Sequence, residues 1–117
     1  MNDLIAQYLD CWNETDPVAR RKLIDSTWAA DASYIDPLAE AHGRDAIEAT
    51  IAAAQAQFPG FVFSLAGPVD THHQQARFTW GLGPEGAEPP IVGFDVVTTD
   101  DAGRIRSVIG FLDRIPS

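Results

Sequence analysis

The chain has 117 residues, the usual size of one domain, and a formal net charge of −9 that disfavours anionic partners. Phosphate backbones and anionic lipid headgroups would repel it, so we expect neither nucleic acid nor membrane as a partner. Cys11 is the single cysteine, so no internal disulfide can form. The N-terminus lacks a signal-peptide pattern, and no stretch approaches the roughly twenty apolar residues of a membrane span. We therefore expect a single domain over residues 1–117, located in the cytoplasm.

Three helices are predicted in the first half of the chain. Residues 3–13 carry an apolar stripe at helical spacing. The stripe consists of Leu4, Ile5, Tyr8, Leu9 and Trp12. Asp16 and Pro17 suit the N-cap and the first turn of a second helix over residues 17–30. A third helix is expected over residues 44–58, where a Pro-Gly pair ends it.

The second half of the chain predicts strands. Residues 31–37 favour a short early strand, and the EAHG segment that follows reads as a loop. Later segments are rich in Val, Ile, Phe and Trp, which is typical of strands. These four strands are expected at residues 61–69, 74–82, 90–99 and 104–113. Helices followed by strands indicate an α+β fold, with the helices in the concave face of a curved, mainly antiparallel sheet and a cavity between them.

Asp95 is the most unusual residue of the strands, because it stands in the apolar stretch IVGFDVV. Burying an ionised, unpaired carboxylate in an apolar interior costs roughly several kcal/mol of folding free energy. Three arrangements would avoid that cost. Asp95 faces solvent, or it pairs with Arg77 on the preceding strand, or burial keeps it protonated.

Two other polar residues are candidates for the cavity. Asp36 precedes Pro37 at a bend, where it either accepts backbone N–H groups or serves as a general base at the cavity mouth. Tyr8 lies on the apolar stripe of the first helix, either as a core residue or with its hydroxyl directed into the cavity.

His72 and His73 do not predict a metal site, because adjacent residues of a strand point to opposite faces. We expect a hairpin-loop role, with His73 reaching the cavity. No HExxH motif, cysteine cluster, nucleotide-binding loop or nucleophilic-serine motif is present in the sequence. We therefore expect neither a metal nor a cofactor.

The segments WAADASYIDP…HGRDAI (residues 28–47) and DDAGRI (residues 100–105) resemble the nuclear transport factor 2-like superfamily. That superfamily includes the ketosteroid isomerases and the SnoaL-like polyketide cyclases. The similarity covers almost the whole chain. It implies a cone-shaped α+β half-barrel and a homodimer formed through the sheet.

The resemblance to the ketosteroid isomerases also implies roles for three residues. The tyrosine of the first helix falls at Tyr8, the general base at Asp36 and a second aspartate at Asp95. Asp36 would then move a proton between carbons next to a carbonyl, while Tyr8 and a protonated Asp95 hold the enolate oxygen. No second tyrosine can be matched to the family's oxyanion network, because Tyr34 lies in the early strand.

The expected function is a metal-free small-molecule enzyme of the isomerase or cyclase type, acting next to a carbonyl of an apolar ring compound. Seven further residues are expected to line the ligand pocket. They are Trp28, His73, Arg77, Val97, Val108, Gly110 and Leu112. Two alternatives stay open: a non-catalytic protein that binds a small ligand, and a structural or assembly role.

Overall fold

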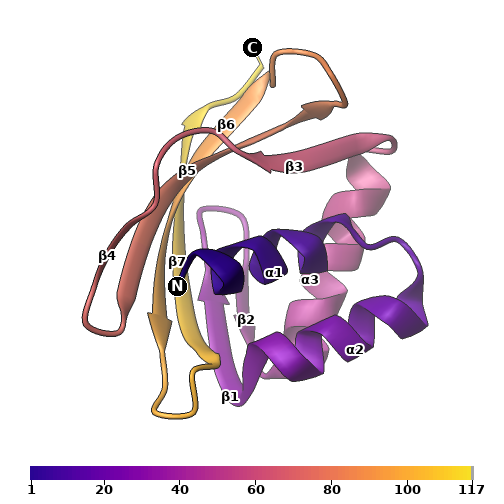
Figure 1. The fold of residues 1–117 in the computed structure, drawn as a ribbon. Helices are drawn as coiled ribbons and strands as arrows, with labels where there is room; N and C mark the ends of the chain where they lie inside the picture. Colours follow the sequence, from indigo (N-terminus) through magenta and orange to yellow (C-terminus); the bar gives the residue numbers. More distant parts are fainter. Residues whose placement is uncertain (117) are drawn as a thin grey trace.

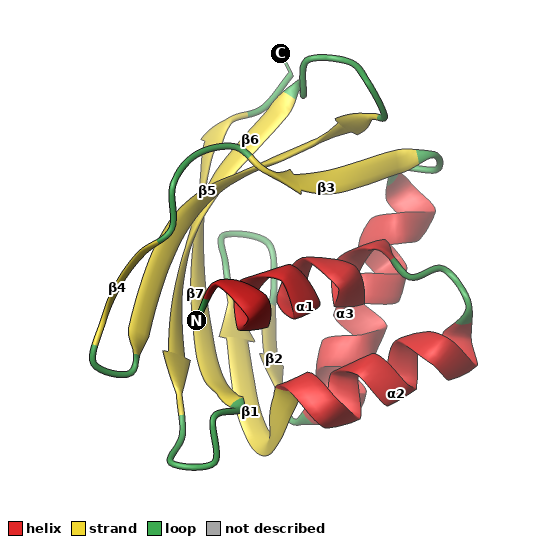
Figure 2. Ribbon diagram, in the orientation of Figure 1, coloured by secondary structure: helices red, strands yellow, loops and turns green. Residues whose placement is uncertain are grey.

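The computed structural model describes residues 1–116 and has a curved sheet with helices on its concave side (Figure 1). The helices are α1 (Asn2–Asn13), α2 (Pro17–Thr27) and α3 (Arg44–Gln57). The strands are β1 (Trp28–Ile35), β2 (Glu40–His42), β3 (Phe61–Leu65), β4 (Asp70–His72), β5 (Gln75–Pro84), β6 (Ile91–Thr99) and β7 (Ile105–Arg114). Figure 2 shows the helices gathered on one side of the strands, which confirms the predicted α+β fold.

The sheet has the order β2-β1-β7-β6-β5-β3, with β4 beside β5. The four long strands predicted in the second half of the chain pair antiparallel in the order β3, β5, β6 and β7. The early strand β1 joins the sheet by pairing in parallel with β7. Burial alternates strictly along β6, so Gly93, Asp95 and Val97 face the helices and Phe94 and Val96 face outward.

The second helix ends at Thr27, and the predicted extension to residue 30 is wrong. Trp28 takes an extended conformation there, with φ −105° and ψ 143°, and begins β1. Arg44 of α3 donates to the Trp28 carbonyl oxygen at 2.6 and 3.0 Å and to the Asp25 carbonyl oxygen at 3.0 Å. A side chain distant in sequence therefore satisfies carbonyl groups at this helix end, a contact that local propensity does not reveal.

Two short strands were not predicted. Strand β2 lies within the expected EAHG loop and pairs with β1, and β4 pairs with β5 within the expected connection. Each has only three residues, which is too few to show an alternating pattern. The strand predicted at residues 61–69 ends at Leu65.

The core lies between the three helices and the inner face of the sheet. Tyr8 of α1 is at its centre, with its ring centroid 5.7 Å from that of Trp28 and 5.9 Å from that of Phe78. The apolar stripe of α1 therefore packs as predicted and carries a phenol hydroxyl into the interior. Within residues 1–116 no helix has the length and apolar character needed to cross a membrane.

Candidate functional site

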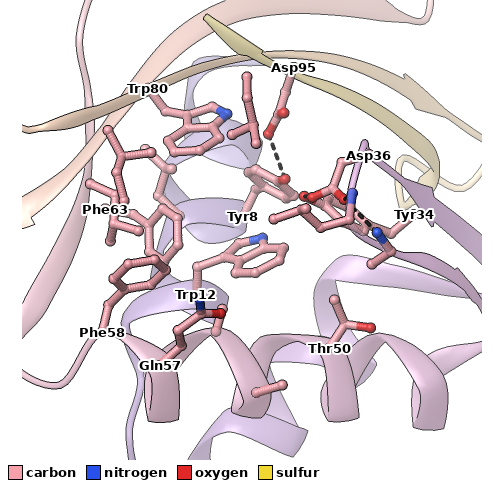
Figure 3. A pocket seen from close by; sticks show the side chains of 18 of the residues that line it. Tyr8, Trp12, Tyr34, Asp36, Thr50, Gln57, Phe58, Phe63, Trp80 and Asp95 are labelled. Carbon is pink, nitrogen blue, oxygen red and sulfur yellow. Dashed lines mark hydrogen bonds between the residues drawn. The ribbon is translucent and has the colours of Figure 1, made fainter. Parts of the chain in front are cut away.

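A pocket of about 440 Å³ lies between α1, α3 and the inner face of the sheet (Figure 3). Aromatic rings form a continuous part of its wall. The ring centroids of Trp12 and Tyr34 are 5.1 Å apart, those of Trp12 and Phe63 are 5.2 Å apart, and those of Phe63 and Trp80 are 5.5 Å apart. The size and lining suit a small apolar molecule.

Asp95 points into this interior and is only 2% exposed. Its Oδ2 accepts a hydrogen bond from the Tyr8 hydroxyl at 2.7 Å. Its Oδ1 is buried and has no hydrogen-bond partner within the described chain. Arg77 lies on the other face of the sheet, where its Nε donates to Asp70 Oδ2 at 3.0 Å. Of the three arrangements that the sequence left open for Asp95, the structure excludes exposure to solvent and pairing with Arg77.

Burial therefore sets the protonation of Asp95. It raises the pKa of this carboxyl group to about 6, and the nearby charge of Asp36 adds to the rise. The Tyr8 hydroxyl and the Trp80 indole lower the pKa in part. The Trp80 Nε1 faces Asp95 in Figure 3 but makes no hydrogen bond, so Tyr8 is the one direct donor to Asp95 in the described structure.

Tyr8 remains a phenol under ordinary conditions. Burial is the main cause that raises its pKa, and the neighbouring Asp95 carboxylate raises it further. The helix α1 thus presents a protonated hydroxyl, whose single proton is donated to Asp95 in this structure.

Asp36 lies directly after β1 and is held by three donors. Its Oδ1 accepts from the backbone N–H groups of Leu38 and Ala39, each at 2.8 Å. Its Oδ2 accepts from the Tyr34 hydroxyl at 2.6 Å. Asp36 is also part of the pocket lining. The turn interpretation and the pocket interpretation of this residue are therefore compatible, because one oxygen serves the turn and the other faces Tyr34.

Tyr34 is a site residue that the sequence reasoning missed. It lines the pocket beside Asp36, and burial followed by the charges of Asp95 and Asp36 raises its pKa, so its hydroxyl stays a donor. A signal was present in the sequence. Residues two apart in an extended segment point to the same side, so the Tyr-Ile-Asp order places this hydroxyl next to the Asp36 carboxylate.

Most of the other residues expected in the pocket lie elsewhere. Leu112 lines it. Trp28, Val97 and Val108 are fully buried members of the core and are not among the residues that line the pocket. Gly110 is outside the lining, although it lies next to the Asp95 and Asp36 side chains.

Arg77 and His73 lie outside the pocket as well. Arg77 points away because it takes the face of β5 opposite to Phe78. His73 is exposed at the turn after β4, with a positive φ of 52°. This turn brings the His72 and His73 Nδ1 atoms to 3.2 Å, so the expectation that their rings point to opposite faces is wrong. Within residues 1–116 no group of three His, Cys, Asp or Glu residues could hold a metal ion.

Comparisons with known proteins agree with this fold. The model of the SnoaL-like domain matches residues 5–108. A solved structure from Agrobacterium tumefaciens strain C58, named as a proposed isomerase of the SnoaL-like family, is 41% identical with a TM-score of 0.90 and 95% coverage of both chains. No curated protein matches the chain.

Two more distant solved structures bear on the fold alone. A proposed polyketide cyclase from Sinorhizobium meliloti is 22% identical, with a TM-score of 0.73 over 92% of this chain and 93% of its own. A protein of ketosteroid isomerase-like fold from Catenulispora acidiphila, in complex with trimethylamine, is 19% identical, with a TM-score of 0.70 over 92% of this chain and 82% of its own. The family model covers most of the chain and the Agrobacterium relative covers nearly all of it. The chain therefore belongs to the SnoaL-like family of the nuclear transport factor 2-like superfamily.

Proposed function

We propose that the pocket catalyses proton transfer next to a carbonyl group of an apolar ring compound, as an isomerase or cyclase of the SnoaL-like family. The observation that carries this proposal is the meeting of Tyr8, Asp36 and Asp95 in one apolar pocket. They come from α1, from the bend after β1 and from β6, so three separate elements contribute polar groups to one place. The name of the Agrobacterium relative agrees with the proposal.

Asp36 acts as the general base in this proposal. Its Oδ2 accepts one hydrogen bond, from Tyr34, and keeps a second lone pair for a proton. The backbone bonds of Leu38 and Ala39 fix the direction of the carboxylate. Asp36 takes a proton from the carbon next to the carbonyl, and the electron pair of that C–H bond moves onto the carbonyl oxygen as an enolate.

Tyr8 and Asp95 stabilise the enolate oxygen. When Asp95 is protonated, the acid donates to the phenol oxygen of Tyr8, and the Tyr8 O–H is released to donate to the substrate. Reprotonation by Asp36 at a different carbon would complete an isomerisation. Attack of the enolate carbon on an electrophilic carbon of the same molecule would complete a ring closure.

The test is deuterium exchange at carbons next to the carbonyl of a cyclic ketone in D2O. We expect Asp36→Asn to reduce the enzyme-dependent exchange by about 100-fold or more, because the base is lost. Asp31→Asn, on an exposed position of β1, is the matched control and should exchange like the unmodified protein. Equal exchange by Asp36→Asn and Asp31→Asn would refute the assignment of Asp36 as the base.

A second candidate function is the non-catalytic binding of an organic cation. The described pocket lining contains two carboxylates and six aromatic residues, and none of its members is basic. Aromatic faces and carboxylates attract alkylammonium groups. The Catenulispora protein, which shares the fold, is in complex with trimethylamine.

Choline and its neutral isostere 3,3-dimethylbutan-1-ol separate the two candidates. Trp12 and Trp80 line the pocket, so their fluorescence reports binding. If the cation is the ligand class, choline should bind about tenfold more tightly than the isostere, and Asp95→Asn should reduce that ratio. Equal affinities for the two compounds would exclude the cation-binding function.

We also propose that the protein forms a homodimer through the outer face of the sheet. Ile35, Ile109 and Phe111 are large apolar side chains exposed on that face. Ile35 and Ile109 are neighbours across β1 and β7, and Phe111 lies beside Phe94 of β6. Together these four residues, here called the outer patch, offer an apolar surface to a second copy.

A further inference from the structure

Asp36, Gly110 and Asp95 lie in one row across three strands. Ile35 is the partner of Ile109 in the parallel pairing of β1 and β7, so the next residues, Asp36 and Gly110, are neighbours. Gly110 is in turn the partner of Asp95 in the pairing of β7 and β6. The two carboxyl groups are therefore separated in the sheet by a single residue that has no side chain.

The space above Gly110 is occupied by the groups on either side of it. A Cβ atom at this position would lie 2.8 Å from Asp95 Oδ1, 3.3 Å from the Asp36 Cβ and 3.7 Å from the Tyr34 hydroxyl oxygen. Gly110 is not among the glycines with a positive φ, so its backbone does not require a glycine. The residue is small because both acidic side chains lean over it.

Each carboxyl group has a phenol as its partner. Tyr8 of α1 donates to Asp95, and Tyr34 of β1 donates to Asp36. Tyr8 and Asp36 are the titratable side chains that shift the pKa of Asp95, and the charge of Asp95 in turn acts on Tyr34. The strand partners of Asp95, Phe78 on β5 and Gly110 on β7, carry no titratable group. The two phenol–carboxyl couples thus face each other over Gly110 within a shared, largely apolar space.

We propose that Gly110 is a positioning residue, which brings Asp36 and Asp95 close enough for the charge of Asp36 to hold the proton on Asp95. The inference rests on the proposed function only in naming Asp36 the base and Asp95 the acid. The negative charge of Asp36 raises the pKa of Asp95, which is the direction that this arrangement requires. The base in its active, ionised form therefore favours the protonated donor that the reaction needs.

The test is the titration of the Asp95 carboxyl carbon by NMR, which needs no substrate. The midpoint should lie near 6 in the unmodified protein. It should fall by about one pH unit in Asp36→Asn, because a nearby negative charge is removed. In the Gly110→Ala background the added methyl group forces the Asp95 carboxyl away, so Asp36→Asn should lower the midpoint by less than half as much.

Gly67→Ala provides the matched background, because a Cβ atom there would meet only the Thr79 Cβ at an ordinary 4.0 Å. In that background Asp36→Asn should have its full effect. The proposal is overturned if Asp36→Asn leaves the Asp95 midpoint unchanged, or if its effect is the same with Gly110→Ala as with Gly67→Ala. If Gly110→Ala does not fold, the comparison of Asp36→Asn with the unmodified protein still decides whether the pair is coupled. A failed deuterium exchange with an intact coupling would reject the proposed reaction and keep the role of Gly110.

Discussion

Asp95 was recognisable in the sequence as a carboxylate in an apolar strand, but its environment was not. The alternation of β6 leaves either face free to turn inward, and the pairing with β5 and β7 decides which one does. Tyr34 was missed for a related reason: the turn accounts for only one oxygen of Asp36, and the other oxygen accepts from the Tyr34 hydroxyl.

Asp95 should make the stability of the protein depend on pH. Its pKa is raised from 3.8 to about 6 on folding, so the native state holds the proton more tightly than the unfolded state. The stabilisation that this proton provides is fully present below about pH 4 and is lost as the pH rises through about 6. Asp95→Asn has no carboxyl proton to lose. From pH 5 to pH 8 the free energy of unfolding of the unmodified protein should therefore fall by about 1 kcal/mol relative to that of Asp95→Asn.

Urea unfolding at the two pH values measures this difference. The exposed Asp31→Asn is the control and should follow the unmodified protein at both pH values. A constant difference between Asp95→Asn and the unmodified protein would mean that Asp95 does not carry a raised pKa.

Tyr34 should matter for the reaction through the orientation of Asp36. Tyr34→Phe removes a 2.6 Å hydrogen bond to Oδ2 and leaves the two backbone bonds to Oδ1 intact. A hydrogen bond to a charged group contributes about 1.5 to 3 kcal/mol, so we expect kcat for deuterium exchange to fall about tenfold or more with KM little changed. Steady-state kinetics would detect this, and an unchanged kcat would show that Tyr34 has no positioning role.

At the level of elements, contacts between segments distant in sequence fix how the helices and strands are joined. Helix α1 and the sheet meet at Asn13, whose side-chain amide both donates to and accepts from the backbone of Phe63. Its Nδ2 donates to the Phe63 carbonyl oxygen at 2.8 Å, and its Oδ1 accepts from the Phe63 N–H at 2.7 Å. Strand β3 is the last strand on its side of the sheet order, so this side chain takes the place of a missing neighbour strand.

Asn13→Ala should loosen β3 and the pocket wall that Phe63 forms. Two half-buried hydrogen bonds are lost, so we expect the free energy of unfolding to fall by about 1 to 2 kcal/mol. Hydrogen exchange of the Phe63 amide should become faster. Asn13→Asp keeps the acceptor for this amide and should preserve slow exchange, whereas equal exchange rates in all three proteins would exclude the clamp.

For the whole molecule, the order of helices and strands was sufficient to predict the fold, because long amphipathic helices and alternating strands carry strong periodic signals. The parallel pairing of β1 with β7 was not predicted, because the sequence of a short strand does not identify the strand that it pairs with. The pocket lining was predicted less well than the fold. Trp28, Val97 and Val108 are fully buried, but they belong to the packed core and do not line the pocket.

The outer patch should control the oligomeric state. Phe111 is 53% exposed on the patch, so Phe111→Glu would bury a charge in a dimer interface and should shift the protein to a monomer. Val18→Glu is the matched control, because Val18 is exposed on α2, away from the sheet. Sedimentation velocity measures the outcome. A monomer before substitution, or a dimer that survives Phe111→Glu, would contradict assembly through this face.

Proton transfer in the pocket is tested most sharply when binding and proton exchange are followed in one sample. Tryptophan fluorescence selects a cyclic ketone that occupies the pocket, and NMR in D2O then follows the protons on the carbons next to its carbonyl. If Asp36 is the base, exchange should run well above the rate in buffer, and Asp36→Asn should slow it by about 100-fold or more while still binding the ketone. A ketone that binds in the pocket but exchanges its protons only at the buffer rate would contradict proton transfer at this site.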